Sequence, residues 1–157
     1  EVVVRAPWLT QGYLHDPEGS ERLWRGGWLH TGDIGVIDPD GFLRITDRLK
    51  DVIKSGGEWI SSLEIEGHIL RVPGVAEVAV IGVPDERWGE RPLAFVVPSR
   101  PGAVSSEEIL QALRRAAEAG EISRYAVPDR IVFLEEIPKT SVGKINKRAR
   151  RERYGAV

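Results

Sequence analysis

The chain has 157 residues, with 22 Lys and Arg against 24 Asp and Glu, so its formal net charge is −2. This balance gives no overall attraction to nucleic acid or to an anionic membrane. The absence of cysteine excludes disulfides, cysteine-type zinc sites and thiol catalysis, and it favours a reducing, cytoplasmic location. The longest apolar run, residues 78–83, is far too short for a transmembrane segment.

The N-terminal residues predict β-structure with little core. Because the chain begins at Glu1 and contains no methionine, we expect a fragment of a longer protein. Residues 1–9 predict a strand, and residues 11–27, dense in Gly, Pro, Asp and Glu, predict a loop. The turn at residues 38–41 predicts a hairpin of strands 34–37 and 42–46. We expect a missing N-terminal part to complete this sheet.

The remaining residues predict a small α+β domain. Charged residues 47–51 predict a polar connector, followed by a turn at 55–57 and a helix capped by Ser61 and running to Leu70. Strands 75–83 and 91–97, a helix from Ser105 to Glu118, a strand at 130–134 and a terminal helix at 144–154 follow. This order favours helices packed on one antiparallel sheet. The expected core sides of the helices are Leu63, Ile65, Ile69 and Leu70, and Ile109, Leu110 and Leu113.

Three motifs occur in order, namely residues 28–33 (WLHTGD), residues 47–57 (DRLKDVIKSGG) and residues 138–144 (PKTSVGK). Together they resemble the adenylate-forming superfamily of acyl-CoA synthetases, luciferases and peptide-synthetase adenylation domains. Residues 47–62 are most similar to bacterial medium- and long-chain fatty acyl-CoA synthetases and their close relatives that act on short acids. The resemblance implies that residues 1–47 end the large N-terminal adenylation domain and that residues 48–157 form the mobile C-terminal domain, with a hinge near residue 50. The implied reaction adenylates a fatty acid with ATP, releases pyrophosphate and transfers the acyl group to CoA.

Two candidate nucleotide-binding residues lie around the predicted hairpin. The carboxylate of Asp33, behind a glycine at the hairpin start, could accept two hydrogen bonds from a vicinal diol, of which ribose is the commonest. The alternative is a turn-capping aspartate. The resemblance assigns Asp33 and Arg48 to the ribose of ATP, whereas a surface ion pair with Asp47 or Asp51 is the alternative for Arg48. It assigns the hinge to Lys50, which could also be an ordinary exposed lysine.

A glycine-containing loop is the candidate thioester-forming face. By resemblance, it enters the active site after domain rotation and lines the channel for the pantetheine arm of CoA. Paired glycines allow a backbone to approach a ligand closely, although a Gly-Gly turn that needs positive φ predicts the same residues. Trp59 is either core beneath the following helix or a lid over the adenylate. The loop residues are Lys54, Ser55, Gly56, Gly57, Glu58 and Trp59.

Lys144 is the candidate catalytic residue. It follows Gly143 in a loop, where an ammonium group is a mobile point charge suited to a crowded phosphate, and the alternative is a solvated surface lysine. The resemblance implies that Lys144 bridges the substrate carboxylate and the α-phosphate during adenylation. No nucleophilic Ser or Cys is then required. Mg²⁺ is implied on the triphosphate, held by phosphates and by residues outside this chain.

No metal site is predicted within the chain, because His15, His30 and His68 do not have a ligand spacing. We expect His68 on the surface and assign no role to His30. The implied partners are a carboxylic acid, ATP, CoA and the enzyme's own N-terminal domain. Relatives dimerise through N-terminal segments, so a homodimer stays open for the intact enzyme. We expect the fragment alone to be inactive.

Two other functions stay open at this point. One is an adenylation domain that delivers an acyl or aminoacyl group to a carrier-protein pantetheine. The other is a nucleic-acid-binding module, since six of the residues from Lys144 to Arg153 are Lys or Arg and one is acidic. That segment has no interleaved aromatic residues, and the rest of the chain is near neutral, so we expect no nucleic-acid partner.

Overall fold

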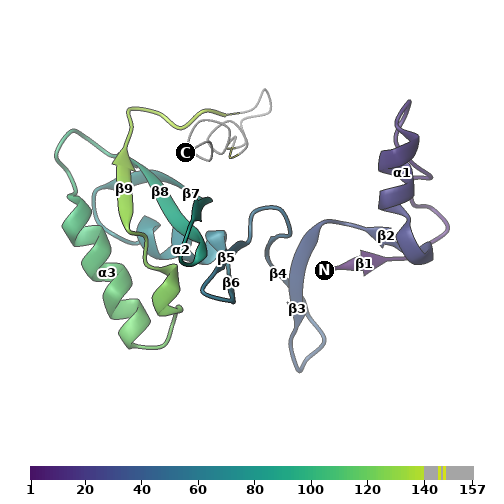
Figure 1. Cartoon of the computed structure of the whole chain (residues 1–157), viewed down its shortest axis with the longest axis horizontal. Coiled ribbons are helices and arrows are strands. Elements are labelled where there is room, and N and C mark those ends of the chain that lie inside the picture. The colour runs from purple at the N-terminus through teal and green to yellow at the C-terminus, as the bar shows by residue number, and fades with distance from the viewer. Residues whose placement is uncertain (140–144, 146, 148–157) are drawn as a thin grey trace. The chain divides into compact units, whose positions relative to one another are not determined.

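The computed structural model describes residues 1–139, 145 and 147. The chain forms two compact units, Glu1–Lys50 and Asp51–Val157 (Figure 1). Each unit has its own strands and helices. The terminal helix predicted at 144–154 lies outside the described residues, apart from the isolated positions 145 and 147.

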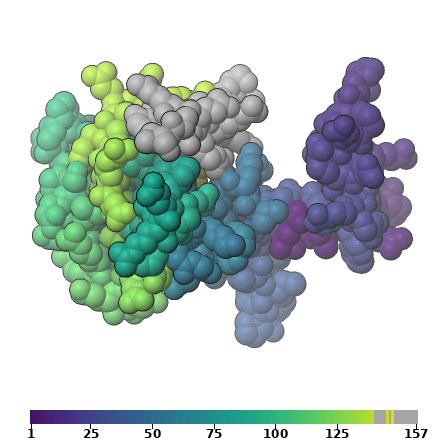
Figure 2. Space-filling view, viewed as in Figure 1, coloured from purple at the N-terminus to yellow at the C-terminus, as the bar shows by residue number. Residues whose placement is uncertain are grey.

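The first unit contains two small antiparallel sheets. Strand β1 (Val3–Val4) pairs with β2 (Leu29–His30), and β3 (Asp33–Ile37) pairs with β4 (Leu43–Arg48). The Asp38 carboxylate accepts hydrogen bonds from the amides of Asp40 and Phe42, and Gly41 has φ of 87°. Side-chain bonding and positive φ thus close the predicted hairpin, which extends away from the helical part of the unit (Figure 2).

Two predictions for the first unit are wrong. The strand expected over residues 1–9 shrinks to Val3–Val4. The loop expected over residues 11–27 contains α1 (Pro17–Leu23) and a short 3₁₀ helix, η1 (Arg25–Gly27). The Asp16 carboxylate accepts a hydrogen bond of 2.8 Å from the Gly19 amide, and Pro17 has the fixed φ suited to a first helical turn. Asp16 and Pro17 therefore begin a helix, although the composition of residues 11–27 indicates a loop.

The first unit has almost no core of its own. Leu23 is the sole buried hydrophobic side chain among residues 1–50, all of which the structure describes. Trp8, Leu14, Ile37 and Phe42 are largely exposed. This small amount of apolar burial agrees with the expectation that residues 1–46 form little core by themselves. Two-stranded hairpins of this kind are only marginally stable in water without further packing.

The second unit is built on one five-stranded sheet. Its strands are β5 (Ile53–Ser55), β6 (Glu58–Ile60), β7 (Val75–Asp85), β8 (Gly89–Pro98) and β9 (Arg130–Phe133). The order is β6-β5-β8-β7, and β9 also pairs with β8. Strand β9 is parallel to β8, whereas the other pairs are antiparallel as predicted. A parallel neighbour needs a long crossover, which is supplied here by α3 (Ser106–Glu118) and η2 (Arg124–Ala126).

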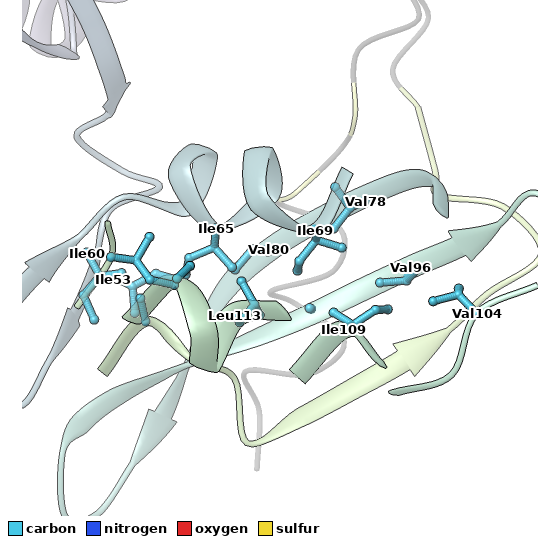
Figure 3. Close-up of a cluster of buried hydrophobic side chains, with 14 residues drawn as sticks. Ile53, Ile60, Ile65, Ile69, Val78, Val80, Val96, Val104, Ile109 and Leu113 are labelled. Atoms are coloured by element: carbon cyan, nitrogen blue, oxygen red, sulfur yellow. The ribbon is translucent and has the colours of Figure 1, made fainter. Parts of the chain in front are cut away.

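Helices α2 (Ser62–Leu70) and α3 cover the sheet. The Ser61 hydroxyl accepts a hydrogen bond from the Glu64 amide, and Ser105 with Glu108 forms a complete capping box. Figure 3 shows the resulting core, in which Ile65, Ile69, Ile109 and Leu113 meet the valines of β7 and β8. The helix boundaries thus follow the predicted caps.

The predicted apolar sides of the helices are only partly buried. Leu63 and Leu70 are 45% and 50% exposed, and Leu110 is half-buried. Ile65 and Ile69 point into the core because they lie four residues apart on α2, and Leu63 and Leu70 flank that face. No helix among residues 1–139 is long and apolar enough to cross a bilayer.

Candidate functional site

The structure brings Asp33 and Arg48 together. The two residues face each other across β3 and β4, and Arg48 Nε lies 3.3 Å from Asp33 Oδ1. Both side chains remain partly exposed, so the carboxylate can still accept a hydrogen bond from a ligand. Asp47 is buried and accepts a hydrogen bond of 2.7 Å from the Arg48 backbone amide. The guanidinium group of Arg48 is therefore held beside Asp33 at one end of the hairpin.

A tight turn fixes the position of this pair. Gly32 has φ of 73°, and the Asp33 amide donates to the Thr31 hydroxyl at 3.1 Å. That hydroxyl donates in turn to the Val2 carbonyl at 2.7 Å. Thr31 therefore bonds the backbone of the turn, which leaves the Asp33 carboxylate directed at Arg48. A surface pocket of about 440 Å³ adjoins the pair, lined by Thr31, Gly32, Arg48, Leu49 and Lys50.

Lys50 is exposed and is the last residue of the first unit. The polar connector predicted at 47–51 is shorter than expected, because Asp47 and Arg48 belong to β4. Paired main chain at these two positions leaves Leu49 and Lys50 as the first residues after the strand.

The six residues of the predicted glycine loop form the β5–β6 hairpin. Gly56 and Gly57 have φ of 60° and 84°, so both occupy the left-handed region at the turn. Lys54 and Trp59 are paired across the strands, and Lys54 Nζ lies 5.5 Å from the centroid of the Trp59 ring. Trp59 is 67% exposed. The alternative that placed Trp59 in the core is wrong. The Trp59 side chain lies on the solvent side of β6, and the next residue, Ile60, is the buried residue of that strand.

The turn contacts two aromatic residues, Trp88 through its backbone carbonyl and Tyr125 through its ring. The Gly56 amide donates to the Trp88 carbonyl at 3.0 Å, and a Cβ atom on Gly56 would lie 3.0 Å from Tyr125 Cε1. The Trp88 and Tyr125 rings are in contact, with centroids 5.3 Å apart. A Cβ atom on Gly57 would meet nothing within 4 Å. Gly56 is thus required by close packing as well as by φ, whereas Gly57 combines positive φ with open space.

Polar side chains from other strands and turns hold the two strands of the hairpin. Glu90 accepts a hydrogen bond of 2.8 Å from the Lys54 amide, and Ser123 donates to the Glu58 carboxylate at 2.5 Å. Buried Ser55 accepts a hydrogen bond from Arg91. Sequence reasoning missed Glu90, Arg91 and Ser123. Two charged residues at the start of an otherwise apolar strand are a signal that could have identified Glu90 and Arg91.

His30 and His68 each lie close to a glutamate carboxylate. His30 Nδ1 lies 2.7 Å from Glu1 Oε2, and this hydrogen bond lowers the pKa of Glu1. The expected surface position of His68 is wrong, because its side chain is only 15% exposed and its Nδ1 lies 3.8 Å from Glu121 Oε2. It lines a surface groove together with residues of α3, among them Glu108, Gln111 and Arg115. No group of three or more His, Cys, Asp or Glu side chains among the described residues could hold a metal.

Lys144 lies outside the described residues. Lys139, in the same motif, is described and places its Nζ atom 2.7 Å from Glu77 Oε1. The start of the motif is therefore attached to β7.

Residues 64–144 match the model of the AMP-binding enzyme C-terminal domain. The chain belongs to this family. It is 47% identical over 155 residues to a long-chain-fatty-acid–CoA ligase of Thermus thermophilus. The aligned region covers 98% of the chain and 28% of that relative. It is 40% identical to a medium-chain-fatty-acid–CoA ligase of Ectopseudomonas oleovorans, over 99% of the chain and 27% of the relative. The chain thus spans less than a third of the length of these relatives.

Solved structures of the family have the same fold. ATP-bound MatB from Rhodopseudomonas palustris superimposes with a TM-score of 0.86 and 33% identity, over 98% of this chain and 30% of that one. A Mycobacterium tuberculosis fatty acyl CoA synthetase is 45% identical, with a TM-score of 0.68, over 99% of this chain and 30% of that one. These matches confirm the predicted superfamily and the fold of a small C-terminal domain of the acyl-CoA synthetase type.

Proposed function

We propose that the chain is the C-terminal part of an ATP-dependent, AMP-forming fatty acid–CoA ligase. The complete enzyme would adenylate a carboxylic acid, release pyrophosphate and transfer the acyl group to CoA. The names of the two fatty-acid–CoA ligase relatives support this choice of substrates. The observation that carries the proposal is that the Asp33–Arg48 pair and the glycine hairpin belong to two different compact units of one chain. A ligase that alternates between two half-reactions needs such a division.

Asp33 and Arg48 are proposed to bind the ribose of ATP. Two vicinal hydroxyl groups can donate to the two oxygens of one carboxylate, and an adjacent guanidinium orients that carboxylate. The 3.3 Å contact and the partial exposure of both side chains support this role. The pocket beside Arg48 offers space for a ligand next to the pair.

Lys144 is proposed to act in adenylation. The substrate carboxylate attacks the α-phosphorus of ATP, the bond to the leaving pyrophosphate breaks, and both reactants carry negative charge before they meet. A positioned ammonium group offsets this repulsion, and removing such a group typically costs about 10² to 10³ in rate. The described residues supply no metal site, so Mg²⁺ would bind to the phosphates of ATP and to residues outside this chain.

The glycine hairpin is proposed to act in thioester formation. The thiol of CoA attacks the acyl carbon of the adenylate, and AMP leaves. Gly57 carries no side chain and faces open space, so a narrow ligand can approach its backbone closely, and exposed Trp59 is available as a lid over the adenylate. Gly56 keeps the turn packed on Tyr125.

We further propose that Lys50 is the hinge that exchanges the two faces. The exposure of Lys50 at the end of the first unit supports this role. The boundary predicted after residue 47 moves to the end of Lys50, because Arg48 pairs with Asp33 within the first compact unit.

Separate assays of the two half-reactions in the full-length enzyme test the proposal. Lys144→Ala should reduce adenylation by about 10² to 10³ and leave thioester formation from a supplied acyl-adenylate nearly unchanged. Gly57→Ala should do the opposite, because strain at positive φ costs about 1 to 3 kcal/mol and distorts the turn. Exchange of labelled pyrophosphate into ATP measures the first reaction, and acyl-CoA yield measures the second. Equal loss of both reactions in either variant would contradict the two-face mechanism.

A further inference from the structure

One edge of β8 is divided between two strands. Strand β7 follows the other edge along its whole length, from the pair Val75–Pro98 to the pair Asp85–Gly89. On the divided edge, β5 meets β8 at the pair Ser55–Gly89, and β9 begins at the pair Leu93–Arg130. The divided edge therefore has a gap in main-chain pairing between Gly89 and Leu93. Arg91 lies in this gap.

The side chain of Arg91 joins both sides of the gap. Its Nε and Nη2 atoms donate to the two oxygens of Asp129 at 2.7 and 3.0 Å, immediately before β9. Other donors reach the carbonyls of Tyr125 and Val127, each at 2.8 Å, and the Ser55 hydroxyl at 3.3 Å. We call these five residues the Arg91 cluster. It connects the last residue of β5 to the segment that contains η2.

The cluster is buried at its centre. The Arg91 side chain is only 11% exposed, and Ser55 is fully buried. Hydrogen bonding to Arg91 lowers the pKa of Asp129, so the carboxylate stays ionised at neutral pH. Only the planar guanidinium can bond a carboxylate through two parallel donors while also reaching two carbonyls, because an ammonium group presents three donors from one point. The contacts are thus specific to arginine rather than to positive charge.

The cluster is connected to the glycine turn through Ser55 and Tyr125. Ser55 directly precedes Gly56, where a Cβ atom would lie 3.0 Å from Tyr125 Cε1, and the Tyr125 carbonyl is one of the acceptors of Arg91. Two consecutive glycines gain little rigidity from their own backbone, so the turn depends on contacts to its neighbours. Arg91 holds the residue before the turn and the residue beneath it in one hydrogen-bonded group.

We propose that Arg91 is a positioning residue for the glycine loop, residues 54–59, during thioester formation, acting through Ser55 and Tyr125. This inference rests on the proposed function for its kinetic consequence. Arg91 itself need not touch CoA or the adenylate.

The first experiment measures the loop itself in the 157-residue chain. Arg91→Lys keeps the charge but loses the parallel donors, so amide hydrogen exchange at residues 55–59 should become about tenfold faster. Exchange in α3 should stay unchanged. Asp129→Asn, at an exposed position, should accelerate the same amides less, and it tests the cluster if Arg91→Lys fails to fold. Arg114→Lys is the matched control, since Arg114 forms an exposed ion pair with Glu107 on α3. Unchanged exchange at residues 55–59 in both cluster variants would overturn the proposal.

The second experiment uses the full-length enzyme. Arg91→Lys should lower kcat for thioester formation about tenfold and change adenylation less than twofold, while Arg114→Lys should change neither. A merely structural role predicts equal loss of both half-reactions, and that result would overturn the proposal. Faster loop exchange with unchanged thioester formation would overturn it as well. A wild-type enzyme that makes no acyl-CoA would overturn the proposed function instead, and the exchange experiment would then decide whether Arg91 orders the loop.

Discussion

At the scale of single residues, Glu66 and Lys147 form a largely buried ion pair in the second unit that also hydrogen-bonds to β7 and α2. Glu66 on α2 is buried, and its Oε1 accepts a hydrogen bond of 2.8 Å from the Val80 amide of β7. Lys147 Nζ lies 2.6 Å from the same oxygen and donates to the Ser62 hydroxyl at 2.8 Å. A buried charge is tolerated when it is paired and hydrogen-bonded, so this pair attaches position 147 to the sheet and to α2.

Neutralising Glu66 should destabilise the chain strongly. Glu66→Gln keeps the shape of the side chain but leaves the Lys147 ammonium without its counter-charge, and breaking such a pair typically costs about 3 to 5 kcal/mol. Urea denaturation followed by circular dichroism measures the free energy of unfolding. Glu64→Gln, two residues earlier on the same helix and exposed, should change it by less than about 0.5 kcal/mol. Similar effects of the two variants would show that the pair contributes little.

At the scale of elements, α3 owes its first turn to a reciprocal cap. The Glu108 amide donates to the Ser105 hydroxyl at 3.3 Å, and the Glu108 carboxylate accepts from the Ser105 amide at 2.8 Å. Both bonds satisfy donors that an α-helix leaves open at its start. Because Ile109 and Leu113 of α3 are core residues, the cap also fixes the register in which the helix meets the sheet.

Removing this cap should have a moderate effect. Ser105→Ala should lower the free energy of unfolding by about 1 kcal/mol, since the Glu108 amide loses its acceptor. Thermal or urea unfolding at pH 7 measures the change. Ser106→Ala, at the first helical position, is the control and should have a much smaller effect. Equal losses for the two serines would contradict the role of the cap.

The same cap should depend on pH. Hydrogen bonds from Ser105 lower the pKa of Glu108 below its ordinary value of 4.5. The ionised carboxylate therefore contributes stability above pH 4.5, and that contribution is lost as the pH falls through the lower folded-state pKa. The stability difference between the wild type and Glu108→Gln should be present at pH 7 and should shrink once the pH falls below 4.5. A difference that grows on acidification would have the wrong sign.

At the scale of the whole molecule, the two units differ in how far they support themselves. The second unit encloses an extended core between its sheet and its helices, whereas the first buries a single hydrophobic side chain, Leu23. Exposed Trp8, Leu14 and Phe42 suit contact with further protein. This contrast agrees with the proposal that the first unit completes a larger domain whose sequence lies outside the chain.

The 157-residue chain by itself should not activate an acid. Purified chain incubated with ATP, Mg²⁺ and fatty acids should release no acid-dependent pyrophosphate, because the described residues supply no metal site and the chain matches less than a third of its ligase relatives. A coupled pyrophosphate assay measures this, with a full-length fatty-acid–CoA ligase as the positive control. Acid-dependent pyrophosphate release by the chain would refute the proposal that adenylation needs residues outside it.

The sequence by itself determined the elements whose signals are local. Caps at Ser61 and Ser105 and the turn at residues 38–41 act within four or five residues, so they could be predicted without tertiary information. The motifs that indicate the family are local strings as well. The helix after Asp16 was missed because a Pro- and Gly-rich composition outweighed its cap.

Only the tertiary structure decided which distant residues meet. The parallel pairing of β9, the contact of Arg48 with Asp33, the exposure of Trp59 and the Arg91 cluster all depend on partners at least 12 residues away or on the packing of whole elements. Such contacts are fixed by how the sheet and helices bury their apolar surface together, which no single window of sequence records. The sequence therefore identified the glycine loop, and the fold revealed the exposure of Trp59 and the arginine that bonds to Ser55.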